Sequence, residues 1–208
     1  MSINLKKNQS IDLRKNADNS VNNLSQVIIG LGWDIKRGES DYDLDACALL
    51  LKDNKLTSSD DIVSYQNKRH KSSTIWSTGD NLTGEGDGDD EQIIVKLDSV
   101  PAEYNKIVFY ATIYNGRSRG QEFSKVENAF IRAVDAGNKE IAKYNISNDP
   151  NASGKRSLVF GEAIRNGQNW EFRATGEYYN TDNLVDVAEM YKSGQNNPEE
   201  RKKLFGLF

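Results

Sequence analysis

The stretch that most restricts the fold of this chain is residues 106–114, KIVFYATIY, where apolar side chains occupy both odd and even positions. Because side chains alternate between the two faces of a β-strand, this run predicts a central strand covered on both sides. Similar short runs, rich in Val, Ile, Tyr, Phe and Trp and separated by Gly, Asn, Asp and Ser, cover residues 27–29, 46–51, 62–65, 93–97, 129–134, 157–160 and 170–174. The pattern predicts an all-β, mainly antiparallel protein: a β-sandwich of two packed sheets.

Two segments depart from this strand pattern. Residues 180–193 carry apolar side chains at helical spacing, with Thr181 or Asp182 as N-cap and Gly194 as a stop, which predicts a short C-terminal helix. Residues 120–128 are expected to form one or two helical turns. The composition changes after residue 192, so we expect a sandwich domain over residues 1–192. Residues 193–208 then form a polar linker and a tail with charged and apolar residues.

The amino-acid composition argues against several classes of function. One Cys and one His among 208 residues exclude an internal disulfide framework and any site that needs two histidines from one chain. The net charge of −4 argues against a dedicated nucleic-acid binder. Phosphate-loop, HExxH, CxxC and GxSxG motifs are absent from the sequence. The first residues lack the apolar run of a signal peptide, so a cytoplasmic location is expected.

A single acidic loop sets the sign of the net charge. Residues 80–91, DNLTGEGDGDDE, hold 6 acids and no bases, and without them 25 acids would face 27 bases. So many carboxylates repel one another unless a cation or a basic partner lies nearby. Calcium takes six to eight oxygen ligands from carboxylates, amides, backbone carbonyls and water, and three glycines let the backbone turn its carbonyls inward. The alternative is a solvated acidic turn.

A second acidic segment precedes the apolar run at residues 46–51. Asp41, Asp43 and Asp45 would point to one side of an extended chain, and Asp34 ends the run before them. Lys36 and Arg37 are the nearest basic residues that could neutralise them. Ligands that are all oxygen favour Ca²⁺ or Mg²⁺ over zinc, and the number of carboxylates favours Ca²⁺. If both segments meet in space, they form one site or two adjacent ones.

The order of several motifs resembles a known family. These are GLGWD at residues 30–34, DYDLDA at 41–46, GDNLTGEGDGDDE at 79–91, RGQ at 119–121, NAFIR at 128–132, LVFGE at 158–162 and WEFRA at 170–174. Together they resemble the TerD family of bacterial tellurite-resistance and general stress proteins over about residues 2–192. One departure lies after the central strand, where members often carry a His and an acid and this chain has Tyr114 and Asn115.

The resemblance implies a two-sheet β-sandwich in the cytoplasm that binds two Ca²⁺ ions through its acidic loops and has no established catalytic activity. It also implies a role in tellurite resistance and other stress responses, with protein partners and peripheral association with the inner membrane through them. The candidate calcium ligands carried over by position are Asp34, Asp41, Asp43, Asp45, Asp80, Asn81, Thr83, Gly84, Gly86, Asp87, Asp89, Asp90 and Glu91.

Two other functions compete with a calcium-dependent interaction module. The first is a Mg²⁺-dependent phosphohydrolase that uses the clustered carboxylates with Lys68, Arg69 and Lys71. The second is a purely structural sandwich that oligomerises and uses its acidic loops for solubility. The sequence leaves the oligomeric state open.

Single residues outside the acidic segments have simpler predicted roles. We expect His70 to lie in a solvated basic loop and Cys47 to be a buried small residue rather than a reactive thiol. Glu162 is expected on a strand surface, as is Glu171. A further expectation is that Arg117, Arg119 and Arg132 pair with surface acids, and that Trp33, Trp76 and Trp170 pack in the core or at its rim.

Overall fold

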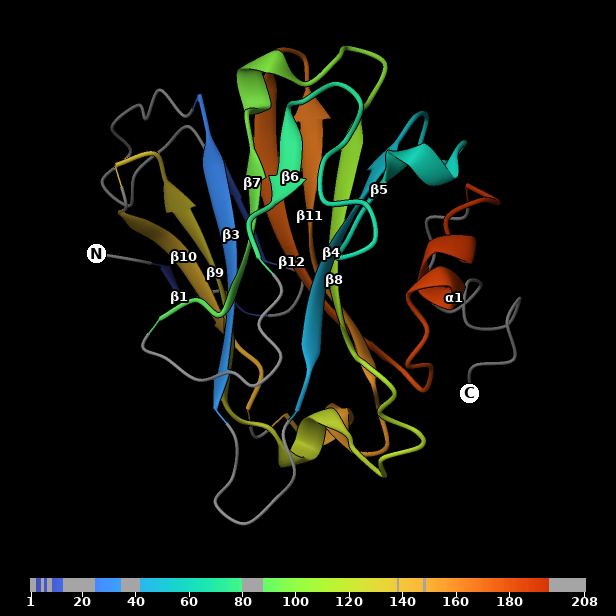
Figure 1. Ribbon diagram of the computed structural model, residues 1–208. Coiled ribbons are helices and arrows are strands. Elements are labelled where there is room, and N and C mark those ends of the chain that lie inside the picture. The colour runs from blue at the N-terminus through green and yellow to red at the C-terminus, as the bar shows by residue number, and fades with distance from the viewer. Residues whose placement is uncertain are drawn as a thin grey trace.

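The computed structural model describes residues 3–4, 6, 9–12, 25–34, 42–79, 88–137, 139–147 and 149–194. Within them the chain forms two six-stranded sheets packed face to face (Figure 1). Sheet A has the order β1 (Ile3–Asn4), β10 (Glu140–Asn145), β9 (Glu127–Asp135), β3 (Val27–Asp34), β7 (Glu91–Val95) and β6 (Ile75–Ser77). Sheet B has the order β2 (Ser10–Asp12), β12 (Asn169–Tyr179), β11 (Ser157–Asn166), β8 (Lys106–Ile113), β4 (Leu44–Leu51) and β5 (Ile62–Val63).

Neighbouring strands are antiparallel, apart from the parallel pair of β1 and β10. The predicted central strand is confirmed as β8, which lies between β4 and β11 and is buried along its whole length. Its inward residues, including Phe109, meet the side chains of sheet A between the sheets, and Phe109 stacks on Phe160 at 6.0 Å between ring centroids. Its outward residues Val108 and Tyr110 belong to a second apolar cluster outside sheet B.

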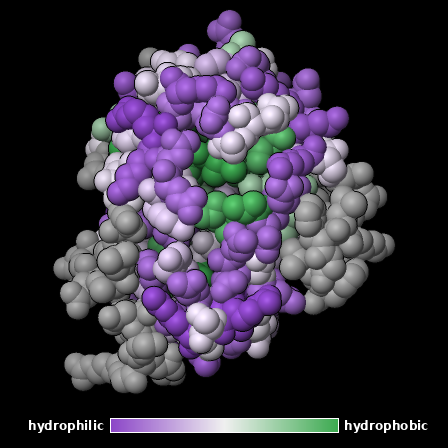
Figure 2. All heavy atoms as spheres, turned by 45° about the vertical axis from the view of Figure 1, so that its right-hand side comes forward, coloured by the Kyte–Doolittle hydropathy of each residue, from purple (hydrophilic) through white to green (hydrophobic). Residues whose placement is uncertain are grey.

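That second cluster exists because a helix covers the outer face of sheet B. Helix α1 (Leu184–Glu189) lies beside sheet B (Figure 1). Its residues Leu184 and Val187 pack with outward side chains of β4, β8 and β11. The Tyr110 hydroxyl donates to the Leu184 carbonyl at 3.3 Å. The helix is confirmed but shorter than expected, and its N-cap is Asn183, whose side chain accepts from the Val185 N–H. Figure 2 turns the right-hand side of Figure 1 forward and shows hydrophobic side chains in a hollow between hydrophilic rims.

Four of the connections among the described residues contain a 3-10 turn. They are η1 (Ser59–Asp61), η2 (Leu97–Ser99), η3 (Phe123–Lys125) and η4 (Pro150–Ala152). The turn η3 lies within residues 120–128, where one or two helical turns are expected. Among the described residues, no helix is both long enough and apolar enough to cross a bilayer.

Two single-residue expectations are wrong. His70 is only 1% exposed, because its ring is enclosed by hydrogen-bonding partners rather than by water. Glu162 is also buried, because Arg173 lies opposite it on β12 and Lys106 projects from β8 on the other side. The aliphatic stems of these two cations cover the carboxylate while their charges neutralise it.

Candidate cation site at the acidic end of the sandwich

Three carboxylates converge where β3 ends and β7 begins. The Asp90 N–H donates to the Leu31 carbonyl at 2.9 Å, and Asp90 Oδ2 accepts from the Trp33 N–H at 2.9 Å. Asp34 ends β3, and its Oδ2 accepts from Asn128 Nδ2 at 2.6 Å. Burial raises the pKa of the Asp90 carboxyl, and the charges of Asp34 and Asp89 raise it further against the opposing effect of the Trp33 N–H.

The side chain of Asp89 is held by protein groups on both oxygens. Its Oδ1 accepts from Arg132 Nε at 2.6 Å and its Oδ2 accepts from Gln92 Nε2 at 3.0 Å. The carboxylate is 2% exposed and lies across Gly30, where an added Cβ would stand 2.2 Å from Asp89 Cγ. The expected pairing of Arg132 with an acid is confirmed, although this acid is buried. A cation at Asp89 would have to compete with the Arg132 guanidinium.

The described ends of the two acidic segments meet at this end of the molecule. Trp33 connects them, since its N–H donates to Asp90 and its indole Nε1 donates to the Tyr42 carbonyl at 3.1 Å. Glu91 connects the two sheets, since its Oε2 accepts from the backbone N–H of Ala46 on β4 at 2.6 Å. This contact links the last residue of the predicted acidic loop to the segment at residues 41–46.

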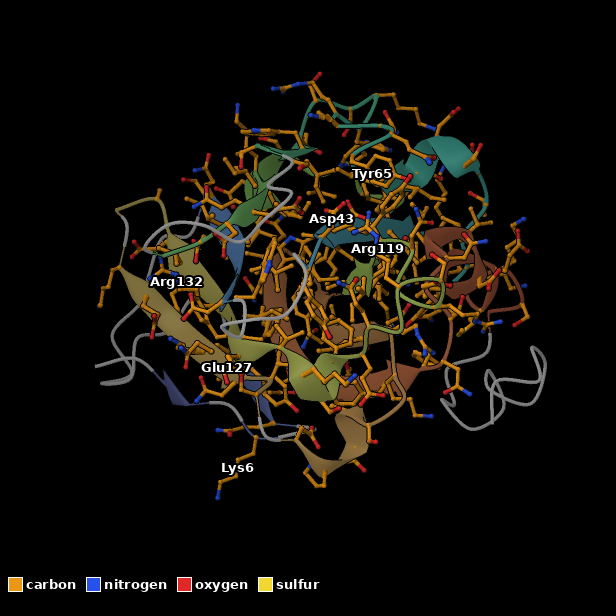
Figure 3. All side chains as sticks on the ribbon, turned by 60° about the horizontal axis from the view of Figure 1, so that its bottom comes forward. Lys6, Asp43, Tyr65, Arg119, Glu127 and Arg132 are labelled. Carbon is orange, nitrogen blue, oxygen red and sulfur yellow. The ribbon has the colours of Figure 1, made fainter. Side chains whose placement is uncertain are left out.

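Asp43 and Asp45 lie on the sheet B side of this junction. Both are buried, and Asp45 lines a cavity of about 270 Å³ on the outer side of sheet B. Figure 3 shows Asp43 near Tyr65 and Arg119, whereas Arg132 lies on the other side of the view. The described acids therefore form one group with Asp34, Asp89 and Asp90 and another with Asp43 and Asp45. Glu91 lies between the groups.

The remaining predicted ligands fall outside the described residues. They are Asp41, Asp80, Asn81, Thr83, Gly84, Gly86 and Asp87. Within the part of the chain that the structure describes, no three His, Cys, Asp or Glu side chains are arranged to hold a metal ion. The oxygen donors that are described suit a hard divalent cation, and further ligands would have to come from the undescribed part of the acidic segments.

Cys47 is the buried small residue that the sequence predicts. It lies on β4 in the apolar cluster beneath α1. Burial raises the pKa of its thiol well above the ordinary value, and the charges of Asp45 and Glu91 act in the same direction against a hydrogen bond with Tyr110. The nucleophilic thiolate is therefore disfavoured and shielded.

We expect the Cys47 thiol of the native protein to resist Ellman's reagent at mildly alkaline pH and to react fully in urea. Labelling should proceed only through opening of the fold, so its rate should be at least about a hundredfold slower than in urea. Stopped-flow absorbance measures both rates. Fast labelling of the native protein would contradict the burial of this thiol.

A buried polar cluster that the sequence does not predict links η1 to the loop before β6. Asp61 Oδ1 accepts from the Tyr104 hydroxyl at 2.7 Å and lies 3.2 Å from His70 Nε2 and 3.1 Å from Lys71 Nζ. His70 Nδ1 lies 2.7 Å from the Ser72 hydroxyl. This order of Ser, His and Asp resembles a hydrolytic triad, but the Asp61 and His70 side chains have no exposed surface. The cluster thus fastens the loop between β5 and β6.

The fold and the acidic end define a class of protein, a two-sheet β-sandwich in which the described ends of two acid-rich segments meet. The chain belongs to the TerD family, since the model of the TerD domain matches residues 1–191. Tellurium resistance protein TerX of Serratia marcescens is 45% identical over 216 residues, which covers 92% of this chain and 100% of the relative. Stress response protein SCP2 of Bacillus subtilis (strain 168) is 39% identical over 204 residues, with 92% and 100% covered.

A solved structure supports the same fold. The crystal structure of a homologue of the telluride resistance protein TerD from Streptomyces coelicolor A3(2) superposes with a TM-score of 0.66 at 20% identity, covering 84% of this chain and 99% of that one. The predicted family and the predicted sandwich are therefore both confirmed. The family is one of tellurium-resistance and stress-response proteins.

Proposed function

We propose that this protein is a calcium-binding, non-enzymatic stress-response protein linked to tellurite resistance. In this proposal Ca²⁺ orders the acidic loops, which then present a surface to a protein partner. The observation that carries the proposal is the proximity of Asp34, Asp89 and Asp90: burial raises the pKa of Asp90, and the charges of Asp34 and Asp89 raise it further. A divalent cation relieves the repulsion among these charges, and the names of the relatives support the stress role.

The contacts suggest different roles for neighbouring acids. Asp34 is exposed and Asp90 half-buried, so both suit cation ligands, whereas Asp89 is occupied by Arg132 and Gln92 and suits a positioning role. In the proposal, the acids and amide of residues 80–87 complete this first site. A second ion would lie toward residues 41–43. We place the protein in the cytoplasm, where its partners would bring it to the inner membrane.

The phosphohydrolase alternative needs free basic residues beside the carboxylates. Two of its three candidates are engaged elsewhere, because Arg69 stacks over Trp76 at 4.8 Å and Lys71 pairs with the buried Asp61. No described contact joins them to the acidic end. We therefore favour an interaction module over an enzyme.

Calcium is expected to raise the melting temperature by about 5–10 °C at a hundredfold excess over its Kd, because a ligand of the native state alone stabilises it. Isothermal calorimetry with Ca²⁺ and then Mg²⁺ measures the binding. In Asp90→Asn the calcium-dependent increase should shrink to less than half, since one ligand charge is lost. Asp98→Asn, an exposed acid outside both segments, should behave as the wild type.

In the absence of calcium, Asp90→Asn should be more stable than the wild type. A raised pKa in the fold means that ionised Asp90 costs stability, and this cost appears as the pH rises through the folded-state pKa. Asn keeps an acceptor for the Trp33 N–H but carries no charge, so in EDTA at about pH 7 the melting temperature should rise by about 2 °C. Absence of calcium binding in the wild type, or an identical response in Asp90→Asn and Asp98→Asn, would refute the proposed site.

A further inference from the structure

The cavity on the outer side of sheet B has features that the calcium proposal does not use. Asp45 from β4, Tyr65 from the loop after β5, Tyr114 after β8 and Asp182 before α1 line it. These elements are far apart in the sequence and meet here because β4, β5 and β8 are neighbours and α1 packs across them. At about 270 Å³ the cavity is smaller than typical sites for drug-sized ligands and suits a single side chain.

Two of the residues that line this cavity are aromatic. The rings of Tyr65 and Tyr114 stand 6.0 Å apart between centroids at 85°, an edge-to-face pair that leaves ring faces for another group. Tyr114 already has a guanidinium beside it, since the Arg119 Cζ atom lies 6.0 Å from the ring centroid. Figure 3 places Tyr65 and Arg119 on the same side as Asp43. The ring of Tyr114 therefore suits a planar cation.

Two carboxylates line the cavity, and two exposed apolar side chains border it. Asp45 is 3% exposed. Burial raises the pKa of Tyr65, and the charge of Asp45 raises it further against the lowering effect of a hydrogen bond with Gln66. At the edge of the cavity, Asp182 Oδ2 accepts a hydrogen bond from the Arg117 backbone N–H at 2.8 Å. Among the described residues, the large hydrophobic side chains that remain exposed are Tyr114 at 39% and Val185 at 46%, and both line this cavity.

We propose that this cavity binds the guanidinium of an arginine side chain from a partner protein, with Asp45 as its ion-pair partner and Tyr65 and Tyr114 as stacking walls. Arginine stacks on aromatic rings and is less strongly hydrated than an ammonium, so it suits a site that combines rings with a shielded carboxylate. Val185 and the exposed face of Tyr114 would contact the apolar neighbours of that arginine. Arg is enriched at interaction hot spots, where surrounding contacts exclude water from the anchor residue.

This inference does not depend on calcium, and it gives Asp45 a role other than that of a metal ligand. The test therefore titrates the full chain in EDTA with an acetylated, amidated Leu-Arg-Leu tripeptide, followed by proton–nitrogen correlation NMR. We expect shifts at Gln66, Asn115 and Asn183, which line the cavity, with a millimolar Kd. The matched Leu-Gln-Leu tripeptide, which lacks the cation, should bind at least about tenfold more weakly.

Two variants separate the binding contribution from folding. Asp45→Asn keeps the size of the buried side chain and should weaken the Leu-Arg-Leu tripeptide at least about tenfold. Tyr114→Leu changes an exposed residue, so the fold should persist, and the loss of the ring should weaken binding about fivefold. Asp98→Asn is the control and should leave the affinity unchanged.

Three results would overturn the proposal. One is equal binding of Leu-Arg-Leu and Leu-Gln-Leu. Another is binding of methylguanidinium as tight as that of the tripeptide, which would assign the cavity to small organic cations. The third is displacement of the tripeptide by CaCl2 with shifts at the same amides, which would make the cavity a metal site. Failure of calcium binding at Asp90 would leave this test intact, because the titration is made in EDTA.

Discussion

Replacement of Gly30 by Ala is expected to lower the free energy of unfolding by about 2–3 kcal/mol, one of the largest effects of any single methyl group in this fold. The added Cβ would stand 2.2 Å from both Cγ and Oδ2 of Asp89, much closer than real carbon contacts allow. The carboxylate would have to move, and its bonds to Arg132 and Gln92 would be lost or lengthened. Urea unfolding with an unchanged m-value measures the loss.

Gly79→Ala is a matched control for Gly30→Ala, and an Asp89→Ala background tests whether contact with Asp89 causes the loss of stability. A Cβ added at Gly79 would have no atom within 4 Å, so Gly79→Ala should change stability by less than about 0.5 kcal/mol. In an Asp89→Ala background the obstacle at Gly30 is gone, so the two substitutions together should cost less than the sum of the single effects. Equal stability of Gly30→Ala and Gly79→Ala would show that Asp89 does not lie against Gly30.

The Gly30–Asp89 contact shows what can and cannot be predicted from the sequence. The sequence identifies the two acidic segments as candidate ligands but leaves open whether they meet, and the structure brings Asp34, Asp89 and Asp90 to the same end. The pairing of Asp89 with Arg132 is not predictable, because it depends on the register in which β9 lies beside β3 and pairs Gly30 with Arg132. Likewise, no pattern indicates that Glu91 accepts from the backbone of Ala46.

The strands show the same division between local and long-range information. Strand β8 is predictable because two apolar faces are visible in its residues. Strands β6 and β10 escape prediction: β6 has three residues, and β10, EIAKYN, mixes polar and apolar side chains on a flank of the sheet. The sequence places His70 in solvent because Lys68, Arg69 and Lys71 surround it. Its burial depends on Asp61 and Tyr104, which only the folded chain brings to it.

Asp61→Asn is expected to lower the free energy of unfolding by about 3 kcal/mol at neutral pH, the second large effect. The Asp61 side chain has no exposed surface, and its Oδ1 serves the Tyr104 hydroxyl, His70 and Lys71 together. Asn would keep a single neutral acceptor, would turn an NH2 donor toward the Thr57 hydroxyl that now donates to Oδ2, and would leave the Lys71 charge without its partner. The neighbouring Asp60 is exposed, so Asp60→Asn is the matched control and should change stability by less than about 0.5 kcal/mol.

The difference in free energy of unfolding between the wild type and Asp61→Asn should become smaller as the pH falls. Burial alone raises the pKa of the Asp61 carboxyl, but hydrogen bonds from Tyr104, His70 and Lys71 outweigh it and hold the pKa below its ordinary value. The unfolded chain therefore takes up this proton first, so the stabilisation is present above the unfolded-state pKa of about 4 and is lost as the pH falls through the lower folded-state value. Urea unfolding of both proteins from about pH 7 to about pH 2 should show the difference narrowing only at the acidic end. A difference that stays constant or widens toward acid would mean that Asp61 is not held as a carboxylate by these three donors.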